Sequence, residues 1–330
     1  MSDPQARFLV TGAKGCIGSW VVKNLVELGR PAVLFDLDSK SHRLDMLLNR
    51  DQMQTVRFFQ GDISEFPDVE RALVDHGITN VIHLAGLQVP FCAADPPRGL
   101  RVNVLGTLNV FEVAKRHREQ LKKIVYASSS AVFGPPEYYG GKQISVNAPL
   151  YPLTHYGAFK QCNEANARVY FNNDGISSVG LRPWAVYGVG RDQGRSSGPT
   201  KAIKAAVVGR KYTIPFTGGL DLHYVDDVAK ILIRAAESDL PGARVYSPRG
   251  SVVQIAEFLN TLKQLIPNAS RLIDASGGSQ QVAYDIDGSD LLRDLGPISF
   301  TSLEEGIEET ARLFEALHRE KRLDLSDLDS

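Results

Sequence analysis

Three residues of this sequence have the types and the spacing needed to take a proton from an alcohol. Tyr156 and Lys160 are four positions apart in a stretch with helical periodicity, so their side chains share one face of the expected helix. Ser129 follows an apolar, strand-like run 27 positions before Tyr156. A free tyrosine ionises near pH ~10, and a neighbouring ammonium together with a bound cofactor's positive charge lowers that pKa. We therefore predict that Tyr156 is a general base.

The matching partner of such a base is a hydride acceptor, and the N-terminal segment has a glycine pattern typical of a dinucleotide site. The glycines of Thr11-Gly12-Ala-Lys-Gly15-Cys-Ile-Gly18 follow an apolar run and precede an amphipathic stretch. Glycines at a strand-to-helix turn let the backbone approach a pyrophosphate, which the free N–H groups of the helix then bind. A plain turn would give the same triplet, but the flanking elements favour cofactor binding by Gly12, Lys14, Gly15, Cys16, Ile17 and Gly18.

The identity of the dinucleotide depends on Asp36, which ends the second expected strand 18 residues after Gly18. A carboxylate at this place accepts hydrogen bonds from the adenosine ribose hydroxyls and repels a 2′-phosphate. Lys14 in the glycine loop argues weakly for the phosphate. We give Asp36 more weight because it would contact the ribose itself, and we predict NAD rather than NADP.

Small and polar residues also follow the third and fourth expected strands. Asp62 would accept a hydrogen bond from the adenine amino group, although a helix cap before residues 66–74 is an equally good role. Ala85 and Gly86 are small where a backbone must approach the cofactor. His83, inside the fourth strand, is expected to be a hydrogen-bonded core residue rather than a catalyst. The cofactor candidates at these two strand ends are Asp62, Ile63, Leu84, Ala85 and Gly86.

The bulk composition excludes several functional classes. Of the 330 residues, 43% are hydrophobic and 23% are charged, as in a globular protein. Because 37 basic residues balance 38 acidic ones, nothing indicates a nucleic-acid or anionic-membrane partner. No apolar run approaches the ~20 residues of a membrane helix. The three cysteines, at spacings that suit neither a zinc site nor a disulfide framework, favour a reducing cytoplasm and predict no metal.

The alternation of short apolar runs with amphipathic stretches positions these candidates. It predicts an α/β fold with a Rossmann-type, doubly wound parallel sheet, whose strand ends bring the candidates together. The expected strands are residues 8–10, 32–36, 56–60, 81–85, 124–128 and 178–181. The expected helices between them include residues 17–28, 68–76, 98–118 and 155–173.

After Pro183 the rhythm becomes irregular and predicts a smaller, mostly helical substrate lobe. The expected helices of this part are residues 200–209, 226–238, 252–265 and 303–319, with a strand at 244–247. We therefore expect an NAD-binding domain at residues 1–183 and a substrate lobe at 184–330, with some chain crossing back to the first domain. The acidic tail, residues 324–330, is expected to fray.

Taken in order, these motifs resemble those of the extended short-chain dehydrogenase/reductases, the NAD-dependent epimerase/dehydratase family. The resemblance rests on Thr-Gly-x-x-Gly-x-x-Gly, Asp36, Asp62-Ile63, Leu84-Ala85-Gly86, Ser128-Ser129-Ser130 and Tyr156-x-x-x-Lys160. It covers nearly the whole chain, because two later segments resemble motifs of the family's second half: Leu181-Arg182-Pro183-x-x-Val186-Tyr187-Gly188 and Val225-Asp226-Asp227-Val228-Ala229. The resemblance implies a Rossmann fold, bound NAD and reversible hydride transfer at a secondary alcohol.

The resemblance also implies roles for the catalytic residues. In the family the catalytic Ser or Thr lies five positions before the glycine of a Val-Tyr-Gly segment, which here reads Val132-Phe133-Gly134 and selects Ser129. By resemblance, Tyr156 deprotonates the substrate hydroxyl and Ser129 hydrogen-bonds the same oxygen. Lys160 holds the nicotinamide ribose and lowers the pKa of Tyr156. Asn103 resembles a family position near the cofactor, although a buried structural amide is nearly as good an interpretation.

Three departures from the family pattern narrow the chemistry. Nucleotide-sugar dehydratases carry an Asp-Glu pair after the catalytic hydroxyl residue, where this chain has Ser130 and Ala131, so dehydration is not expected. Many nucleotide-sugar epimerases have an asparagine where this chain has Ala185 and an arginine where it has Leu220. Neither replacement can bind a diphosphate. We therefore favour a smaller sugar, sugar acid or polyol.

The expected cleft has several candidate substrate-binding residues. Arg191 and Arg195, in a loop rich in Gly, Arg and Ser, could hold a carboxylate, although loop charges are commonly just solvated. The full candidate set is Gln88, Ser130, His155, Trp184, Arg191 and Arg195.

The leading hypothesis is an NAD-dependent oxidoreductase that oxidises a secondary hydroxyl of a small carbohydrate-like molecule. An epimerase is the nearest alternative, because it needs the same Ser129, Tyr156 and Lys160. A third is a non-catalytic, NAD-sensing regulator, for which Tyr156 and Lys160 would be unnecessary. By resemblance to the family, the helices at 98–118 and 155–173 are expected to form a homodimer interface.

Overall fold

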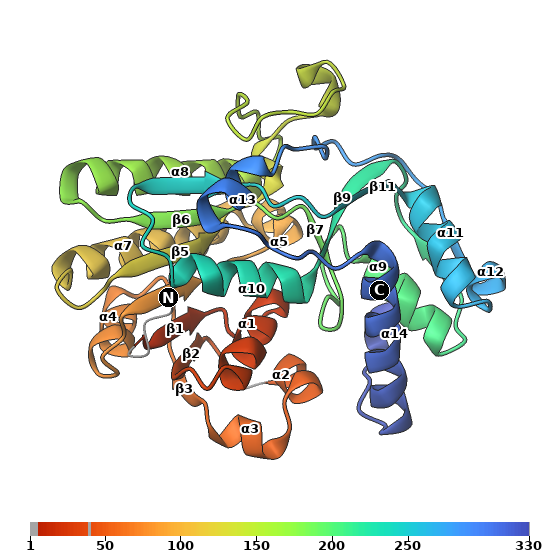
Figure 1. Ribbon diagram of the computed structural model, residues 1–330, viewed down its shortest axis with the longest axis horizontal. Coiled ribbons are helices and arrows are strands. Elements are labelled where there is room, and N and C mark those ends of the chain that lie inside the picture. Colours follow the sequence, from red (N-terminus) through yellow and green to blue (C-terminus); the bar gives the residue numbers. More distant parts are fainter. Residues whose placement is uncertain (1–5, 39–40, 330) are drawn as a thin grey trace.

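The centre of the molecule is a parallel sheet of seven strands (Figure 1). The computed structural model describes residues 6–38 and 41–329. In spatial order the strands are β10 (Ala243–Tyr246), β6 (Ser178–Leu181), β5 (Lys123–Ala127), β4 (Asn80–His83), β1 (Phe8–Thr11), β2 (Ala32–Asp36) and β3 (Arg57–Gln60). The chain order reverses between β1 and β4, where such sheets open a ligand crevice. This topology confirms the predicted doubly wound α/β fold.

Helices cover both faces of the sheet. On one face, α1 (Cys16–Glu27) packs against α10 (Val225–Ala236), which also contacts β4 and β5. On the other face, α7 (Gly106–Arg116) packs against both α4 (Phe66–Val74) and α8 (His155–Asp174). Because the central strands are covered on both sides, they are continuous apolar runs.

The stretch that was predicted as one helix, residues 98–118, consists of three segments. They are α6 (Pro96–Leu100), a π-helical segment η1 (Arg101–Leu105) and α7. Asp95 caps the first of them, because its side chain accepts a hydrogen bond from the Arg98 N–H. The two prolines of this helix follow Asp95 directly. The wider π turn contains Asn103, and such turns are common at functional sites.

The second half of the chain adds small sheets and helices beside the main sheet. One three-stranded sheet contains β7 (Ala185–Tyr187), β9 (Gly219–Tyr224) and β11 (Ser251–Gln254), and β8 (Tyr212–Ile214) pairs with β12 (Ile273–Ala275). The helices here are α9 (Gly198–Val207), α11 (Ile255–Leu265), α12 (Ala269–Leu272), α13 (Ser289–Leu295) and α14 (Leu303–Arg319). β10 returns to the main sheet. The division at residue 183 stays a prediction.

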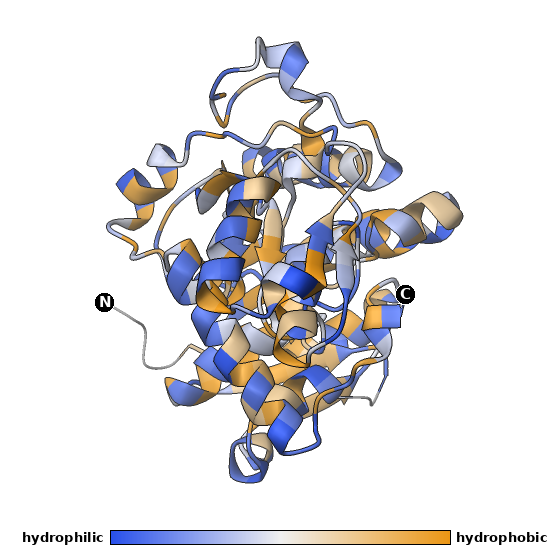
Figure 2. Ribbon diagram, turned by 90° about the vertical axis from the view of Figure 1, so that its right-hand side faces the viewer, coloured by the Kyte–Doolittle hydropathy of each residue, from blue (hydrophilic) through white to orange (hydrophobic). Residues whose placement is uncertain are grey.

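Short elements complete the chain. They are α2 (His42–Leu47), α3 (Arg50–Gln54), α5 (Val89–Ala94), η2 (Ser130–Val132), η3 (Pro136–Tyr139) and η4 (Ser326–Asp329). Hydrophobic residues gather on the strands and on the inward faces of the helices (Figure 2). Among the described residues, no helix has both the length and the apolar character needed to cross a membrane.

The acidic tail does not fray over its described residues, contrary to our expectation. η4 packs beside α9, with Leu328 only 8% exposed. The buried Lys204 ammonium donates to the Asp324 carbonyl oxygen at 3.2 Å and to Asp327 Oδ1 at 2.8 Å. The tail is therefore ordered by a lysine about 120 positions earlier in the chain.

Candidate active site

The first two turns of α8 present Tyr156 and Lys160, and the end of β5 leads to Ser129. Thr154 caps the helix, because its Oγ1 accepts a hydrogen bond from the Gly157 N–H at 3.0 Å. Lys160 is 5% exposed; its Nζ donates to the Ala127 carbonyl oxygen at 2.6 Å and lies 5.5 Å from the centre of the Tyr156 ring. The three predicted catalytic residues are thus brought together at the carboxyl end of β5.

Burial controls the titration of both groups. It raises the pKa of Tyr156 and outweighs the Ser129 hydroxyl and the Arg191 guanidinium, which both lower it. It also lowers the pKa of Lys160 to about 8, against the opposite effects of Cys92 and Glu164. The chain's own groups therefore do not give Tyr156 the lowered pKa expected from its neighbour Lys160.

A buried ion pair fixes the serine segment to α8. Glu164 lies one turn beyond Lys160. Its carboxylate accepts hydrogen bonds from Arg182 Nε at 2.7 Å and from Arg182 Nη2 at 2.6 Å. The same carboxylate accepts a hydrogen bond from the Ser128 hydroxyl at 2.5 Å. Glu164 is 1% exposed and Arg182 is 5% exposed, so each neutralises a charge that would be costly to bury alone. This pair holds Ser129 opposite Tyr156.

A cavity of about 680 Å³ opens where the chain order of the sheet reverses. Its walls contain Phe35 at the end of β2 and Arg98 and Arg101 from the α6–η1 segment. The predicted cofactor residues that line it are Gly12, Lys14, Gly15, Asp36, Asp62, Ile63, Leu84, Ala85 and Gly86. The strand ends therefore bring most of the predicted cofactor set to one cavity.

The glycine loop is packed too closely for other residue types. Gly12 has φ +66°, and a Cβ there would lie 2.6 Å from the Ala85 nitrogen. A Cβ on Gly18 would lie 2.2 Å from the Gly12 carbonyl oxygen. Gly18 thus serves helix packing and does not line the cavity. The loop presents bare backbone to the cavity, which suits a pyrophosphate.

Asp36 is held at the edge of this cavity by backbone donors. Its Oδ2 accepts a hydrogen bond from the Lys14 N–H and its Oδ1 one from the Leu37 N–H, both at 2.9 Å. The Lys14 ammonium donates to the Asp38 carbonyl oxygen at 2.6 Å and lies 3.6 Å from the centre of the Phe58 ring. The fixed carboxylate and the engaged ammonium both suit a ribose without a 2′-phosphate.

Like Gly18 and the active-site pair Tyr156 and Lys160, three further predicted cofactor residues lie outside the wall of this cavity. Ile17 packs on the core, and Cys16 lines a smaller neighbouring cavity, where burial raises the pKa of its thiol to about 11. Asn103 is buried; its amide accepts a hydrogen bond from the Leu87 N–H at 2.7 Å and donates to the Leu87 carbonyl oxygen at 2.9 Å. These bonds are those of a buried structural amide, and the predicted place of Asn103 near the cofactor stays a prediction.

Two of the open alternatives are decided by hydrogen bonds. His83 is buried between the hydroxyls of Thr11, at 2.7 Å, and Thr107, at 3.0 Å, and burial lowers its pKa to about 3. It is the core histidine that was expected. Asp62 accepts hydrogen bonds from the N–H and the hydroxyl of Ser64, whereas Glu65 occupies the N-cap position of α4. Asp62 is therefore not the helix cap.

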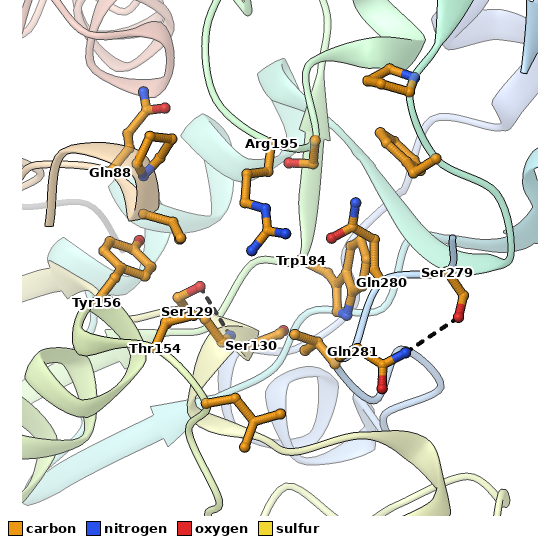
Figure 3. A pocket seen from close by; sticks show the side chains of 18 of the residues that line it. Gln88, Ser129, Ser130, Thr154, Tyr156, Trp184, Arg195, Ser279, Gln280 and Gln281 are labelled. Atoms are coloured by element: carbon orange, nitrogen blue, oxygen red, sulfur yellow. Dashed lines mark hydrogen bonds between the residues drawn. The ribbon is translucent and has the colours of Figure 1, made fainter. Parts of the chain in front are cut away.

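A second cavity, of about 490 Å³, contains Tyr156 and Ser129 in its wall (Figure 3). Of the predicted substrate residues, the structure places Gln88, Ser130, Trp184, Arg191 and Arg195 in this wall. His155 is not among them. It is exposed and stacks on Phe159 with ring centres 6.1 Å apart. Neighbouring residues on a helix point about 100° apart, which fits the different surroundings of His155 and Tyr156.

Sequence reasoning missed part of this wall. Thr154, Pro215, Phe216 and the segment 278–282 also line the cavity (Figure 3). Thr154 had a readable signal, because a threonine before a helical pattern is a typical cap. The segment Gly-Ser-Gln-Gln-Val has no signal, since its composition is that of an ordinary loop.

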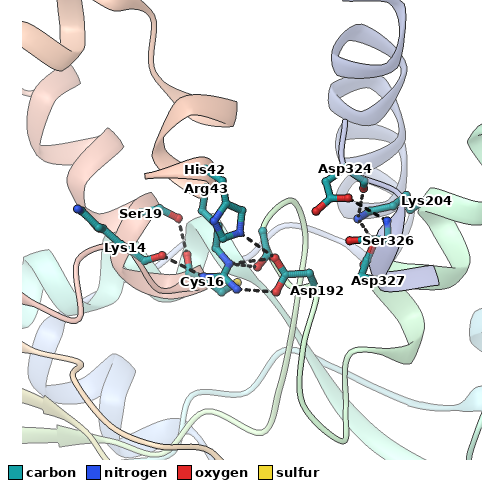
Figure 4. Close-up of polar contacts among 11 residues, drawn as sticks. Lys14, Cys16, Ser19, His42, Arg43, Asp192, Lys204, Asp324, Ser326 and Asp327 are labelled. Atoms are coloured by element: carbon teal, nitrogen blue, oxygen red, sulfur yellow. Dashed lines mark hydrogen bonds and ion pairs between the residues drawn. The ribbon is translucent and has the colours of Figure 1, made fainter. Parts of the chain in front are cut away.

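Arg43, in α2, connects the two ligand-facing loops (Figure 4). Its Nη1 donates to the Lys14 carbonyl oxygen at 3.1 Å, in the glycine loop. Its Nε donates to the Gly190 carbonyl oxygen at 3.0 Å, and its Nη2 to Asp192 Oδ1 at 2.6 Å. Burial alone would raise the pKa of Asp192, but the bonds to Arg43 and His42 lower it. The loop at 188–197 is thus fastened to the glycine loop.

The smaller cavity, of about 190 Å³, links the two larger ones. It shares Gly15 and Gly86 with the first cavity and Gln88 and Arg191 with the second. A dinucleotide that binds along the strand ends would therefore reach the neighbourhood of Tyr156. The glycine loop, the fixed Asp36 carboxylate and this continuity fit NAD.

Known proteins share this fold and these motifs. Residues 8–247 match the model of the NAD dependent epimerase/dehydratase family. A UDP-glucose 4-epimerase from Mycolicibacterium smegmatis is 31% identical over 69% of this chain and 72% of its own. The chain belongs to the NAD-dependent epimerase/dehydratase family. It is an NAD-dependent enzyme of the extended short-chain dehydrogenase/reductase type, either a dehydrogenase or an epimerase.

Solved structures agree with this assignment. The UDP-glucose 4-epimerase of Thermus thermophilus, in complex with NAD, has a TM-score of 0.77 and 26% identity, over 93% of this chain and 98% of its own. The UDP-N-acetylglucosamine 4-epimerase of Methanobrevibacter ruminantium, in complex with UDP-N-acetylmuramic acid, has a TM-score of 0.80 and 25% identity, over 96% and 99%.

Proposed function

We propose that this enzyme oxidises a secondary hydroxyl of a carbohydrate-like substrate to a ketone and then reduces the ketone on its opposite face, as a sugar epimerase does. The observation that carries the first step is the meeting of Ser129 and Tyr156 in one cavity wall, with the Lys160 ammonium beside the tyrosine ring. The names of the relatives support the second step, because they are epimerases.

The side chains of this enzyme handle the proton of the reacting hydroxyl. Tyr156 Oη takes that proton and returns it when the ketone is reduced. The Ser129 hydroxyl donates a hydrogen bond to the same substrate oxygen. Lys160, held by the Ala127 carbonyl oxygen, places a positive charge beside Tyr156, but burial still raises the pKa of the phenol, so the cofactor's charge would be needed to favour the ionised form.

The cofactor set of the chain would hold NAD along the strand ends. The loop at Gly12 and Gly15 offers backbone to the pyrophosphate, and Asp36 accepts the ribose hydroxyls. When bound, NAD supplies the hydride acceptor and a positive charge that further favours ionised Tyr156.

A second outcome, net oxidation with release of the ketone, was our first expectation from the sequence. The comparisons favour epimerisation over it. One observation still supports net oxidation: Ala185 and Leu220 are both fully buried, so neither position can contact a diphosphate. Without a bound nucleotide, fewer contacts would keep the ketone in the cavity while it rotates to present its opposite face.

A turnover assay with the Tyr156→Phe variant tests the proposal. Without the phenolic oxygen, kcat should fall ~10²- to 10⁴-fold while NAD affinity stays unchanged, because the loss is that of a general base. The assay uses NAD with a panel of sugars, sugar acids and sugar nucleotides. An isomerised product without lasting NADH identifies an epimerase, and accumulating NADH a dehydrogenase. Unchanged turnover by Tyr156→Phe would refute the mechanism.

The quaternary structure and location are further parts of this proposal. Leu100, Leu105 and Val169, on the η1–α8 side of the molecule, are 40–53% exposed and support a homodimer across this surface. Light scattering after gel filtration tests this, with a charge introduced by Val169→Glu expected to give monomers. The three cysteines are free thiols, which suits a reducing cytoplasm.

A further inference from the structure

The substrate cavity has an unbalanced charge. Among the described residues that line it, Arg191 and Arg195 are the only charged side chains, and no carboxylate faces them. The other wall residues are neutral, including Gln88, Gln280 and Gln281. The whole chain, by contrast, has a net charge of −1. The positive charge is thus local to the cavity that contains Tyr156.

Neither arginine is neutralised within the described part of the chain. Arg195 has no hydrogen-bond or ion-pair partner there, and Figure 3 shows its guanidinium pointing into the cavity between Tyr156 and Gln280. Arg191 donates from Nη2 to the Ser196 hydroxyl at 3.0 Å, but its buried Nε has no partner. Arg195 is exposed and free to bind a ligand, whereas the buried Nε of Arg191 is a donor that is costly to leave unpaired, so an anionic ligand that reached both would stabilise this arrangement.

The nearest carboxylate in sequence is engaged elsewhere. Asp192 binds Arg43, which fastens the loop from outside the cavity. Gly194, with φ +97°, then turns the chain so that Arg195 returns to the cavity. A side chain there would meet Gln88 Oε1, which lies 2.4 Å from the position of its Cβ. The loop is therefore held in a shape that directs both arginines to one space.

The position of this charge differs from that of a diphosphate site. The two places where the family resemblance implies diphosphate ligands, Ala185 and Leu220, are apolar and 0% exposed. Arg191, in contrast, lies close enough to Tyr156 to lower the pKa of its phenol. Because Arg191 and Arg195 line the same cavity as Tyr156, the cationic groups lie with the reacting groups and not at Ala185 or Leu220.

We propose that the substrate is a carbohydrate that bears its own anionic group, a carboxylate or a phosphate monoester, bound by Arg191 and Arg195 beside the reacting hydroxyl. This inference rests on the proposed function. It names the substrate class of the same site: a sugar acid or sugar phosphate rather than a neutral sugar or a nucleotide sugar.

Kinetics with matched compounds tests the proposal on the full-length enzyme with NAD. The panel contains a neutral sugar, the corresponding aldonate and uronate, its 6-phosphate and its UDP derivative. We expect kcat/KM to be at least tenfold higher for one anionic class, and the acid and phosphate arms identify which. Arg195→Gln should lower that kcat/KM at least tenfold, mainly through KM. Arg195→Lys should recover part of it, whereas the exposed Arg319→Gln, in α14, is the matched control.

Calorimetry separates failure of this inference from failure of the proposed function. NAD-loaded Tyr156→Phe enzyme should bind the anionic sugar, and the additional Arg195→Gln change should weaken that binding at least tenfold. Turnover of a neutral or UDP sugar that is indifferent to Arg195 would refute the inference and keep the function. Binding of the anionic sugar without turnover in the wild-type enzyme would refute the proposed function and keep the inference. If no anionic sugar binds, the inference is wrong.

The two arginines are tested separately, because Arg191 also borders the small cavity beside the glycine loop. Arg191→Gln should raise KM for the anionic sugar at least tenfold and leave the NAD affinity within twofold. A tenfold loss of NAD affinity with an unchanged sugar KM would assign Arg191 to the cofactor and remove it from the proposal.

Discussion

The cofactor cavity and the substrate cavity are formed by different parts of the protein. The first depends on close packing of backbone at the ends of parallel strands, where Gly12 and Ala85 lie within a few ångströms of each other, although larger side chains such as Arg98 also line it. The second is formed by side chains from separate loops, including Arg195 and the segment 278–282. Geometry that only glycine allows restricts the sequence strongly, whereas a loop side chain is free to vary. The cofactor is therefore easier to infer than the substrate.

The strongest way to break this comparison is to add one methyl group to the glycine loop. Gly12→Ala places a Cβ 2.6 Å from the Ala85 nitrogen, so the loop must move. A displacement of this size should weaken NAD binding roughly 100-fold, while the KM of the sugar changes little. Titration of NAD by fluorescence or calorimetry measures the effect.

Gly29→Ala is the matched control for that variant. Gly29 has φ +63°, close to that of Gly12, but a Cβ there has no neighbour within 4 Å. Both variants should lose about 1–2 kcal/mol of unfolding free energy from the left-handed backbone, and Gly12→Ala should lose more because its Cβ meets the Ala85 backbone. Only Gly12→Ala should lose NAD affinity, and equal NAD affinities in the two variants would contradict the role of the close contact.

A smaller effect is expected at the edge of the same cavity. Asp36→Asn removes the negative charge that repels a 2′-phosphate, so the ratio of NAD to NADP affinity should fall about tenfold, or ~1.4 kcal/mol. The ratio is measured by titration of both dinucleotides. A wild-type enzyme that itself prefers NADP tenfold would show that Asp36 does not select the cofactor.

The smallest effect concerns the stability that depends on the buried His83 of β4. Burial holds the pKa of His83 near 3, so the unfolded chain, with a histidine pKa near ~6.5, binds a proton that the folded protein does not. Stability should therefore fall as the pH falls below ~6.5, by about 1.4 kcal/mol between pH ~7.5 and ~5.5. Urea unfolding at both pH values measures this loss. His83→Gln should remove it, and identical slopes for the two proteins would count against the assignment.

Local signals predicted the main sheet well. The expected strands 32–36 and 178–181 have the bounds of β2 and β6, because both are short apolar runs ended by polar or breaking residues. The helix expected at 252–265 begins only at Ile255, since Val252 and Val253 pair with β9 as a strand. That pairing partner is about 30 positions away, so helical periodicity near the boundary could not reveal it.

The remaining misses also depend on distant partners. The tail at 324–329 is ordered by Lys204, and an acidic, apolar-poor sequence carries no sign of that contact. Arg43 was not singled out, because its partners Gly190 and Asp192 are almost 150 positions later. The catalytic pair Tyr156 and Lys160 was accessible because both residues are on one helix. Sequence spacing therefore located the functional residues that a single helix positions.

The contacts of Arg43 join the loop beside the substrate cavity to the loop beside the cofactor cavity. To move away from the glycine loop, the loop at 188–197 must give up the Arg43 bonds to Gly190 and Asp192, one of them an ion pair. Any separation of these two loops must therefore break a guanidinium–carboxylate contact, so the loop beside the substrate cavity and the loop beside the cofactor cavity do not open independently.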